Sequence, residues 1–260
     1  MNPHLSAGHC GAALVTGGGK RIGKAISLRL ARAGYAIAIH TSERSRAEAV
    51  AVCDEIAQAG GRSVVLMADL GDLAHVEGLV PAARAALGDV TLLVNNASLF
   101  VPDAATPFDA DLFARHMAVN LRAPLQLAAQ LRENLAAGTE GAIVNVLDQR
   151  VARLNPHYFT YTLSKSALHT ATTTLAQSLA PDVRVNAVAP GPVMPNANDG
   201  PGAFEGEAAA TPLAHSVDPD EIAEAVAYLA AARSVTGQTI FVDSGQRLSW
   251  RTPDVIAGYG

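Results

Sequence analysis

The sequence has few of the residues that mark several specialised classes of protein. Only two of its 260 residues are cysteines, Cys10 and Cys53, and neither has a CxxC or Cys/His ligand spacing. We therefore expect no structural disulfide, no metal site and a reducing compartment. No segment approaches the roughly eighteen apolar residues of a membrane span, and residues 1–10 do not have the pattern of a signal peptide. These absences predict a soluble, cytoplasmic protein.

Charge is also scarce, at 17% of the residues, with a net charge of −5 and no run rich in Lys or Arg. This pattern argues against nucleic acid or an anionic membrane as the main partner. By contrast, a chain of 260 residues that is 49% hydrophobic can bury a sizeable core. No linker or shift in composition divides it. We expect a single domain over residues 1–260, with terminal extensions at 1–10 and 248–260.

Short apolar runs alternate with longer segments of helical periodicity. The runs are nearly continuously apolar, as is typical of strands covered on both faces. The predicted strands are Ala12–Thr16, Tyr35–Ile39, Ser63–Met67, Thr91–Val94, Ala142–Leu147, Val183–Val188 and Thr239–Val242. The predicted helices are Ile22–Ala33, Arg46–Ala59, Leu73–Leu87, Ala123–Leu135, Phe159–Leu179 and Pro219–Ala231. Repeated βα units predict an α/β protein, a doubly wound Rossmann domain with a seven-stranded parallel sheet and helices on both faces.

The least regular stretch, residues 190–216, contains five prolines and follows the sixth predicted strand. In a doubly wound sheet, ligands bind beyond the carboxyl ends of the strands, where this stretch begins. Long loops in compact domains usually serve function, with a disordered insertion as the alternative. We predict that residues 190–216 form a substrate-binding loop.

A glycine-rich turn, TGGGKRIG, joins the first predicted strand to the first predicted helix and places glycine at Gly17, Gly19 and Gly23. Glycines let the backbone approach a pyrophosphate, and the following helix N-terminus supplies amide donors. The spacing is G-x-G-x-x-x-G, and such a turn can also be a simple connection. Its position in the first βα unit favours a dinucleotide site, with Ile22 beside it.

The end of the second predicted strand favours NADPH over NAD. No carboxylate occupies the immediate strand end, where NAD-binding proteins hold the ribose hydroxyls. The donors and cations available for a 2′-phosphate are Lys20, Arg21, His40, Thr41, Ser42 and Arg44. Glu43 keeps the alternative open, because a one-residue shift of the loop would bring it to the ribose.

Tyr161 and Lys165 are four residues apart on a predicted helix, so both can face one cleft, and Asp148 precedes the tyrosine by 13 residues. An isolated tyrosine has a pKa of about 10 and is a poor proton shuttle at neutral pH. A neighbouring cation favours the phenolate and brings the group into working range. The alternative is an ordinary helix with an exposed lysine and a half-buried tyrosine.

From Ala12 to about Gly245 the chain resembles the short-chain dehydrogenase/reductase superfamily. The matching motifs, in order, are TGGGKRIG, Asp69, Asn95-Asn96-Ala97, Asn120 in MAVN, YTLSK and RVNAVAPGPV (Arg184–Val193). The resemblance implies that Tyr161 delivers a proton, that Lys165 binds the nicotinamide ribose, and that Asn120 has a structural and catalytic role. It also implies a homotetramer. The further cofactor contacts that it implies are Asp69, Asn95, Ala97, Pro190, Gly191 and Val193.

The departures from the superfamily resemble its pteridine reductase and dihydromonapterin reductase branch. Asp148 replaces the usual serine, Arg21 replaces a loop glycine, and NNAS followed by Phe100 replaces NNAG. The branch implies that Asp148 and Tyr161 transfer protons, that Phe100 stacks a pterin against the nicotinamide, and that Ser98 lines the substrate site. Pro195, where relatives commonly have threonine, leaves the cofactor contacts of that turn open.

We therefore expect an NADPH-dependent oxidoreductase that reduces a C=N bond of a pterin or dihydropterin. One alternative is a general carbonyl or alcohol oxidoreductase in which Asp148 replaces serine. Another is a protein that binds the cofactor without turnover. For single residues, Asp148 could instead cap a strand end or pair with Arg150 or Arg153, and Phe100 could be a core residue. The segment Leu248–Gly260 could reach a neighbouring subunit's site or be a frayed tail.

Overall fold

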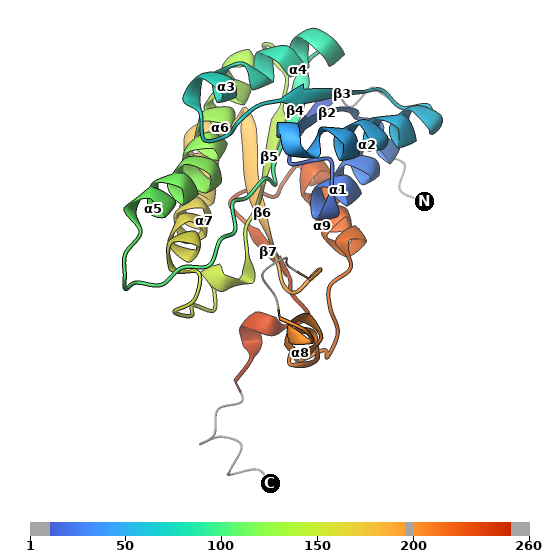
Figure 1. Ribbon diagram of the computed structural model, residues 1–260. Coiled ribbons are helices and arrows are strands. Elements are labelled where there is room, and N and C mark those ends of the chain that lie inside the picture. The colour runs from blue at the N-terminus through green and yellow to red at the C-terminus, as the bar shows by residue number, and fades with distance from the viewer. Residues whose placement is uncertain (1–10, 196–199, 251–260) are drawn as a thin grey trace, which may run out of the picture.

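The computed structural model of the protein describes residues 11–195 and 200–250 (Figure 1). The predicted extension at 1–10, most of the one at 248–260 and residues 196–199 of the predicted loop lie outside the described residues. A central sheet is flanked by helices.

Seven parallel strands form one sheet in the order β3-β2-β1-β4-β5-β6-β7. Their bounds are β1 Ala12–Thr16, β2 Ala36–Thr41, β3 Ser63–Met67, β4 Val90–Asn95, β5 Gly141–Val146, β6 Val183–Pro190 and β7 Thr239–Val242. The chain winds outward from β1 to β3, returns to β4 beside β1, and then winds the other way. Ligands bind at such a reversal, beyond the carboxyl ends of the strands. The predicted fold class is confirmed.

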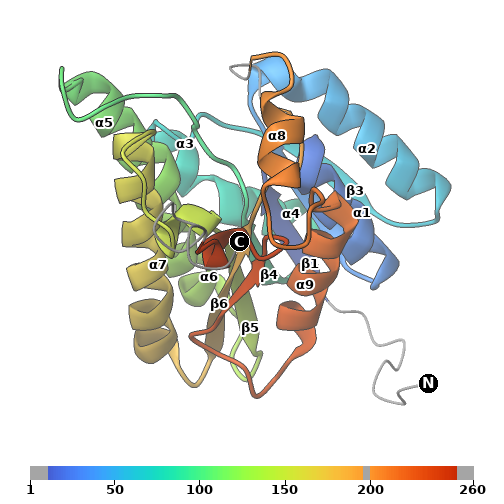
Figure 2. The same cartoon turned by 90° about the horizontal axis from the view of Figure 1, so that it is seen from below.

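Helices cover both faces of the sheet (Figure 2). On one face lie α1 (Arg21–Arg32), α2 (Arg46–Gln58) and α9 (Pro219–Ala231), which share one buried apolar cluster with the strands. On the other face lie α4 (Leu79–Leu87), α6 (Ala123–Asn134) and α7 (Phe159–Leu179), which share a second cluster. Because the central strands pack on helices at both faces, their sequences are largely apolar.

Three helical segments differ from the prediction. The predicted helix 73–87 is two helices, α3 (Leu73–Glu77) and α4, because Gly78 separates them and Pro81 is tolerated only in a first turn. Helix α5 (Ala110–Met117) was not predicted; it begins where the Asp109 carboxylate accepts a hydrogen bond from the Leu112 amide at 2.9 Å. The predicted loop 190–216 contains a further helix, α8 (Ala203–Ala209).

Candidate active site

A cavity of about 1370 Å³ lies at the carboxyl ends of the central strands and extends from the glycine turn to α8. Most residues that the sequence singles out line it. They are Gly17, Gly19, Lys20, Arg21, Ile22, Gly23, His40, Thr41, Ser42, Arg44, Asp69, Ala97, Ser98, Phe100, Asp148, Tyr161, Lys165, Pro190, Gly191 and Val193. Arg150, Tyr158 and Glu207 line it as well, without having been predicted as site residues.

Close backbone contacts shape the glycine turn. Gly17 has φ +63°, and a Cβ on Gly23 would lie 2.1 Å from the Gly17 carbonyl oxygen, so neither position accepts a side chain without strain. Thr16 ties the turn to the end of β4, because its Oγ1 accepts hydrogen bonds from the amides of Asn96 and Ala97 at 2.9 and 3.0 Å. The turn therefore presents backbone amides at the N-terminus of α1, as a bound pyrophosphate requires.

Arg21 joins the glycine turn to the segment after β6. Its φ of +51° lies in the left-handed region that favours glycine, where the superfamily usually has that residue. Its guanidinium donates hydrogen bonds to the carbonyl oxygens of Pro195 at 2.9 Å and Met194 at 3.2 Å. In this structure Arg21 therefore holds the start of the predicted substrate loop, rather than pointing freely toward a 2′-phosphate.

His40 was predicted as one of the groups around a 2′-phosphate, and in the structure both of its ring nitrogens are engaged by the backbone. The ring is 3% exposed; Nδ1 accepts from the Gly17 amide, and Nε2 donates to the Ala68 carbonyl, both at 3.2 Å. Burial lowers the pKa of His40 to about 4, so the ring is neutral at pH 7 and both nitrogens are engaged. His40 instead supports the glycine turn. Thr41 is also buried, and its hydroxyl donates to the Ser45 carbonyl at 3.2 Å.

The exposed rim beyond β2 retains the groups that suit a 2′-phosphate. Lys20, Ser42 and Arg44 are exposed and line the cavity, with the Lys20 ammonium 2.9 Å from the Ser45 hydroxyl. Glu43 lies on the same rim and faces the Arg46 guanidinium at 3.9 Å. This rim therefore offers cations and a hydroxyl, with one carboxylate among them.

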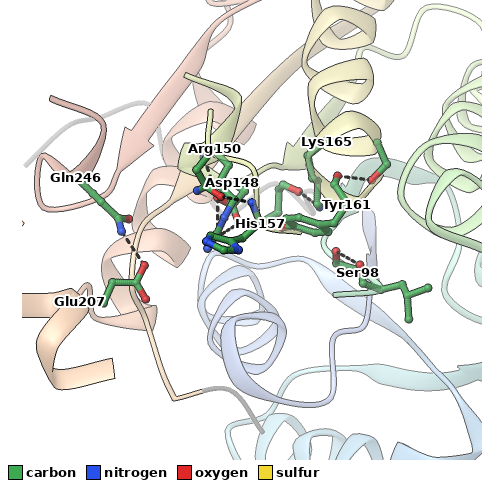
Figure 3. A network of polar contacts seen from close by, with 12 residues as sticks. Ser98, Asp148, Arg150, His157, Tyr161, Lys165, Glu207 and Gln246 are labelled. Carbon is green, nitrogen blue, oxygen red and sulfur yellow. Dashed lines mark hydrogen bonds and ion pairs between the residues drawn. The ribbon is translucent and has the colours of Figure 1, made fainter. Parts of the chain in front are cut away.

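Tyr161 lies beside Asp148, as the spacing predicts, and donates its phenolic hydrogen to Asp148 Oδ2 at 2.9 Å (Figure 3). Burial and the Asp148 carboxylate raise the pKa of Tyr161 well above its ordinary value. The Lys165 ammonium donates to the Val146 carbonyl at 2.7 Å, and burial lowers the pKa of Lys165 to about 8. The neighbours of Tyr161 in this structure therefore raise its pKa, where the sequence predicted a lowering, and Tyr161 is a protonated donor.

Asp148 makes several contacts at once. Its Oδ1 accepts from the Arg150 amide at 2.8 Å and so caps the short helical turn Gln149–Val151. The Arg150 guanidinium lies 3.3 Å from Oδ2, which makes the ion pair that the sequence offered as an alternative role. The cap, the ion pair and the bond to Tyr161 coexist.

Asp148, Tyr161 and Lys165 form the candidate catalytic triad, and an aromatic cluster lies beside it. Phe100 stacks on Tyr158 with ring centroids 4.2 Å apart and planes 2° apart, and it meets Tyr161 edge-on at 4.6 Å. The Arg150 guanidinium carbon lies 5.5 Å and 5.2 Å from the centroids of the two stacked rings. Phe100 is thus a cavity residue rather than a core residue. Tyr158 precedes the first residue of α7, so the helical periodicity of the sequence did not point to it.

Asn120 and Asn95 do not line the cavity. Asn120 lies in a π-helical turn (η2, Ala118–Arg122), where its amide donates to the Leu99 carbonyl at 2.9 Å and the Ser164 hydroxyl at 3.0 Å. Asn95 is buried and donates to the Asn145 side chain at 2.9 Å. Asn120 therefore positions the segment that follows β4, and Asn95 joins the ends of β4 and β5. The catalytic role of Asn120 and the cofactor contact of Asn95 stay predictions.

A distant carboxylate caps the helix that carries Tyr161 and Lys165. Tyr158, at the N-cap of α7, has φ +55° and no capping bond from its side chain. Asp103, from the segment that follows Phe100, accepts from the Thr160 amide at 3.0 Å and from its hydroxyl at 2.5 Å. Asp103 thereby links the Phe100 segment to the start of α7.

We expect Asp103→Ala to lower both stability and activity. Loss of the cap should reduce the free energy of unfolding by about 1–2 kcal/mol, and displacement of Phe100 and Tyr161 should reduce kcat about tenfold. Asp109→Ala is the matched control, because it removes a cap of the same kind from α5 and leaves the bonds of Asp103 to Thr160 in place. Urea denaturation and steady-state rates measure the two effects. Equal kcat in both variants would contradict the linking role.

Within residues 11–195 and 200–250, no helix combines the length and apolar character that a membrane crossing needs. The same residues contain no group of three or more His, Cys, Asp or Glu side chains placed to hold a metal ion.

Comparisons with known proteins cover nearly the whole chain. Residues 17–247 match the family described as enoyl-(acyl carrier protein) reductase. An uncharacterized oxidoreductase of Methylorubrum extorquens is 35% identical over 90% of this chain and 97% of its own. A 3-oxoacyl-[acyl-carrier-protein] reductase of Staphylococcus aureus is 30% identical over the same shares.

Solved structures of reductases also match nearly the whole chain. FolM alternative dihydrofolate reductase 1 from Brucella canis, complexed with NADP, is 46% identical with a TM-score of 0.92, over 96% of this chain and 99% of that one. The Brucella suis protein, also with NADP, is 47% identical with a TM-score of 0.90, over 94% and 97%. With the strand order, the glycine turn and the Tyr161–Lys165 pair in place, the chain belongs to the short-chain dehydrogenase/reductase family of oxidoreductases.

Proposed function

We propose that the protein is an NADPH-dependent reductase that acts on a C=N bond of a pterin or dihydropterin. The observation that carries the proposal is the 2.9 Å hydrogen bond from Tyr161 to Asp148. An ionised carboxylate cannot donate a hydrogen bond to a substrate carbonyl, as serine does, but it can accept and return a proton. Such a pair suits protonation of a basic ring nitrogen.

The described residues fit the cofactor. Bound NADPH supplies the hydride that the carbon of the C=N bond receives. The glycine turn would hold the pyrophosphate, while Lys20, Ser42 and Arg44 would hold the 2′-phosphate. The NADP in the two Brucella structures supports this choice. The remaining contacts would come from Gly17, Gly19, Ile22, Gly23, Asp69, Ala97, Pro190, Gly191 and Val193.

The protein residues handle the proton. Tyr161 gives its phenolic proton to the ring nitrogen as the adjacent carbon accepts the hydride, so the C=N bond becomes CH–NH. The Lys165 ammonium stabilises the phenolate that remains, and Asp148 orients Tyr161 and passes a replacement proton from water. Phe100, released from its stack on Tyr158, would cover the flat face of the pterin, and Ser98 would bond its edge.

Steady-state assays test the proposal. Wild-type protein with NADPH or NADH is offered dihydromonapterin, dihydrobiopterin, dihydrofolate and a set of simple ketones. We expect pterin turnover with NADPH preferred. Good ketone reduction without pterin turnover would favour the general carbonyl oxidoreductase instead. NADPH binding without oxidation of any substrate would favour a protein that has lost turnover.

We also propose a cytoplasmic homotetramer, as in most relatives. Exposed apolar side chains support the assembly: Leu163 on α7 is 43% exposed, and a shallow groove on α5, η2 and α6 is lined by Met117, Leu121 and Leu125. Elution as a monomer at micromolar concentration in size-exclusion chromatography would contradict the tetramer.

A further inference from the structure

Helix α8 brings a carboxylate to the substrate end of the cavity. Glu207 and Phe204 of this helix line the cavity, and the Glu207 Oε1 accepts a hydrogen bond from Gln246 Nε2 at 2.7 Å. Gln246 is 8% exposed, so the surrounding packing holds its amide and thereby fixes the position of the Glu207 carboxylate. In the view of Figure 3, Glu207 and Gln246 lie on the opposite side of Asp148 and Arg150 from Ser98.

This end of the cavity is lined by two carboxylates, Asp148 and Glu207, and by two cations, Arg150 and Lys165. The Arg150 guanidinium is paired with Asp148 at 3.3 Å, and the Lys165 ammonium donates to the Val146 carbonyl at 2.7 Å. Burial lowers the pKa of Arg150, but Asp148, Tyr161 and Glu207 outweigh it and raise that pKa above its usual value. The Glu207 charge is therefore felt at Arg150, beside Asp148.

No other cation balances Glu207 directly. Among the described residues, the Glu207 carboxylate accepts a hydrogen bond from Gln246, and it forms no ion pair with a lysine or an arginine. Lys20 and Arg44, on the rim beyond β2, would face the phosphates of a bound cofactor, which are themselves negative. A negatively charged group on the substrate would thus meet the Glu207 carboxylate, which has no ion-pair partner.

We propose that Glu207 is a specificity-determining residue that favours pterins with neutral, hydroxylated side chains over pterins with anionic side chains. This inference rests on the proposed function. A hydroxyl of the substrate side chain can donate a hydrogen bond to the Glu207 carboxylate, whereas a substrate carboxylate is repelled by it. In Figure 3, Glu207 lies beyond Asp148 and Arg150 as seen from Ser98, so the side chain of a pterin whose ring lies at Ser98 and Tyr161 would extend toward the Glu207 carboxylate.

The test compares kcat/KM for dihydromonapterin, whose side chain is neutral, with that for dihydrofolate, whose glutamate is anionic. Glu207→Gln keeps the shape and removes the charge. We expect this variant to reduce the preference for dihydromonapterin by about three- to tenfold, through faster use of dihydrofolate. Added salt should weaken the preference of the wild type and leave that of the variant nearly constant.

Glu205→Gln is the matched control, because Glu205 is exposed on the same helix and does not line the cavity. An unchanged preference in Glu207→Gln, or an equal change in Glu205→Gln, would overturn the inference while leaving pterin reduction intact. A wild-type protein that reduces neither pterin would overturn the proposed function, and the inference with it, before any variant is made.

Discussion

Replacement of Tyr161 with phenylalanine is expected to reduce kcat for dihydropterin reduction by about 10²- to 10⁴-fold. The change removes the phenolic O–H that lies 2.9 Å from Asp148 and leaves the buried ring and its edge contact with Phe100. The binding of NADPH should change little, because the ring contributes shape rather than a charged contact. Single-turnover kinetics and a fluorescence titration of NADPH measure the two quantities separately.

Tyr228→Phe is the control for this variant, since Tyr228 is 57% exposed on α9 and lies outside the cavity. It should keep wild-type kinetics. The proton-donor role of Tyr161 would be contradicted if Tyr161→Phe kept more than about a tenth of the wild-type kcat, because a general acid typically contributes far more.

Replacement of Asp148 with serine is expected to exchange one activity for another. Pterin reduction should fall by about 10²-fold, because the proton path through the carboxylate is lost. Reduction of simple ketones should rise, because a serine hydroxyl can donate a hydrogen bond to a substrate carbonyl. Ratios of kcat/KM for dihydromonapterin and for a ketone panel measure the exchange.

Two further variants separate the role of the Asp148 carboxylate from that of the new serine hydroxyl and from that of the ion pair with Arg150. Asp148→Ala removes the carboxylate and offers no hydrogen-bond donor in its place, so pterin reduction should fall without a gain in ketone reduction. Arg150→Gln removes the ion pair at 3.3 Å but keeps the carboxylate, and should keep most of the pterin activity. Undiminished pterin reduction in Asp148→Ser would show that the carboxylate does not take part in proton transfer.

The sequence predicted the fold because the strands are buried on both faces and therefore read as continuous apolar runs. The two halves of the helix predicted at 73–87 could not be separated by periodicity, since α3 and α4 keep the same apolar face across Gly78. Helix α8 was not predicted, although alanine and glutamate favour helices, because it has only seven residues, contains Gly206 and is flanked by glycine and proline. Only one of its seven side chains, Ala208, is buried, so it lacks an apolar stripe.

The site was predictable where function sets the spacing, as for Asp148, Tyr161 and Lys165. It was not predictable where a contact joins distant segments. The donation from Arg21 to Pro195 and the support of Glu207 by Gln246 each depend on the packing of loops that carry no periodic pattern. His40 was misjudged because its residue type indicates charge, whereas its strand position buries it and lowers its pKa to about 4.

The central claim is that this chain delivers hydride and proton across a pterin C=N bond, and one measurement tests it most directly. Wild-type protein is incubated with 7,8-dihydromonapterin and NADPH that carries deuterium at the transferred position, and the product is analysed by mass spectrometry and NMR. We expect a tetrahydropterin with one deuterium on the ring carbon C6 and a solvent-derived proton on N5. Recovery of unreduced dihydropterin, together with deuterated alcohols from simple ketones, would contradict it.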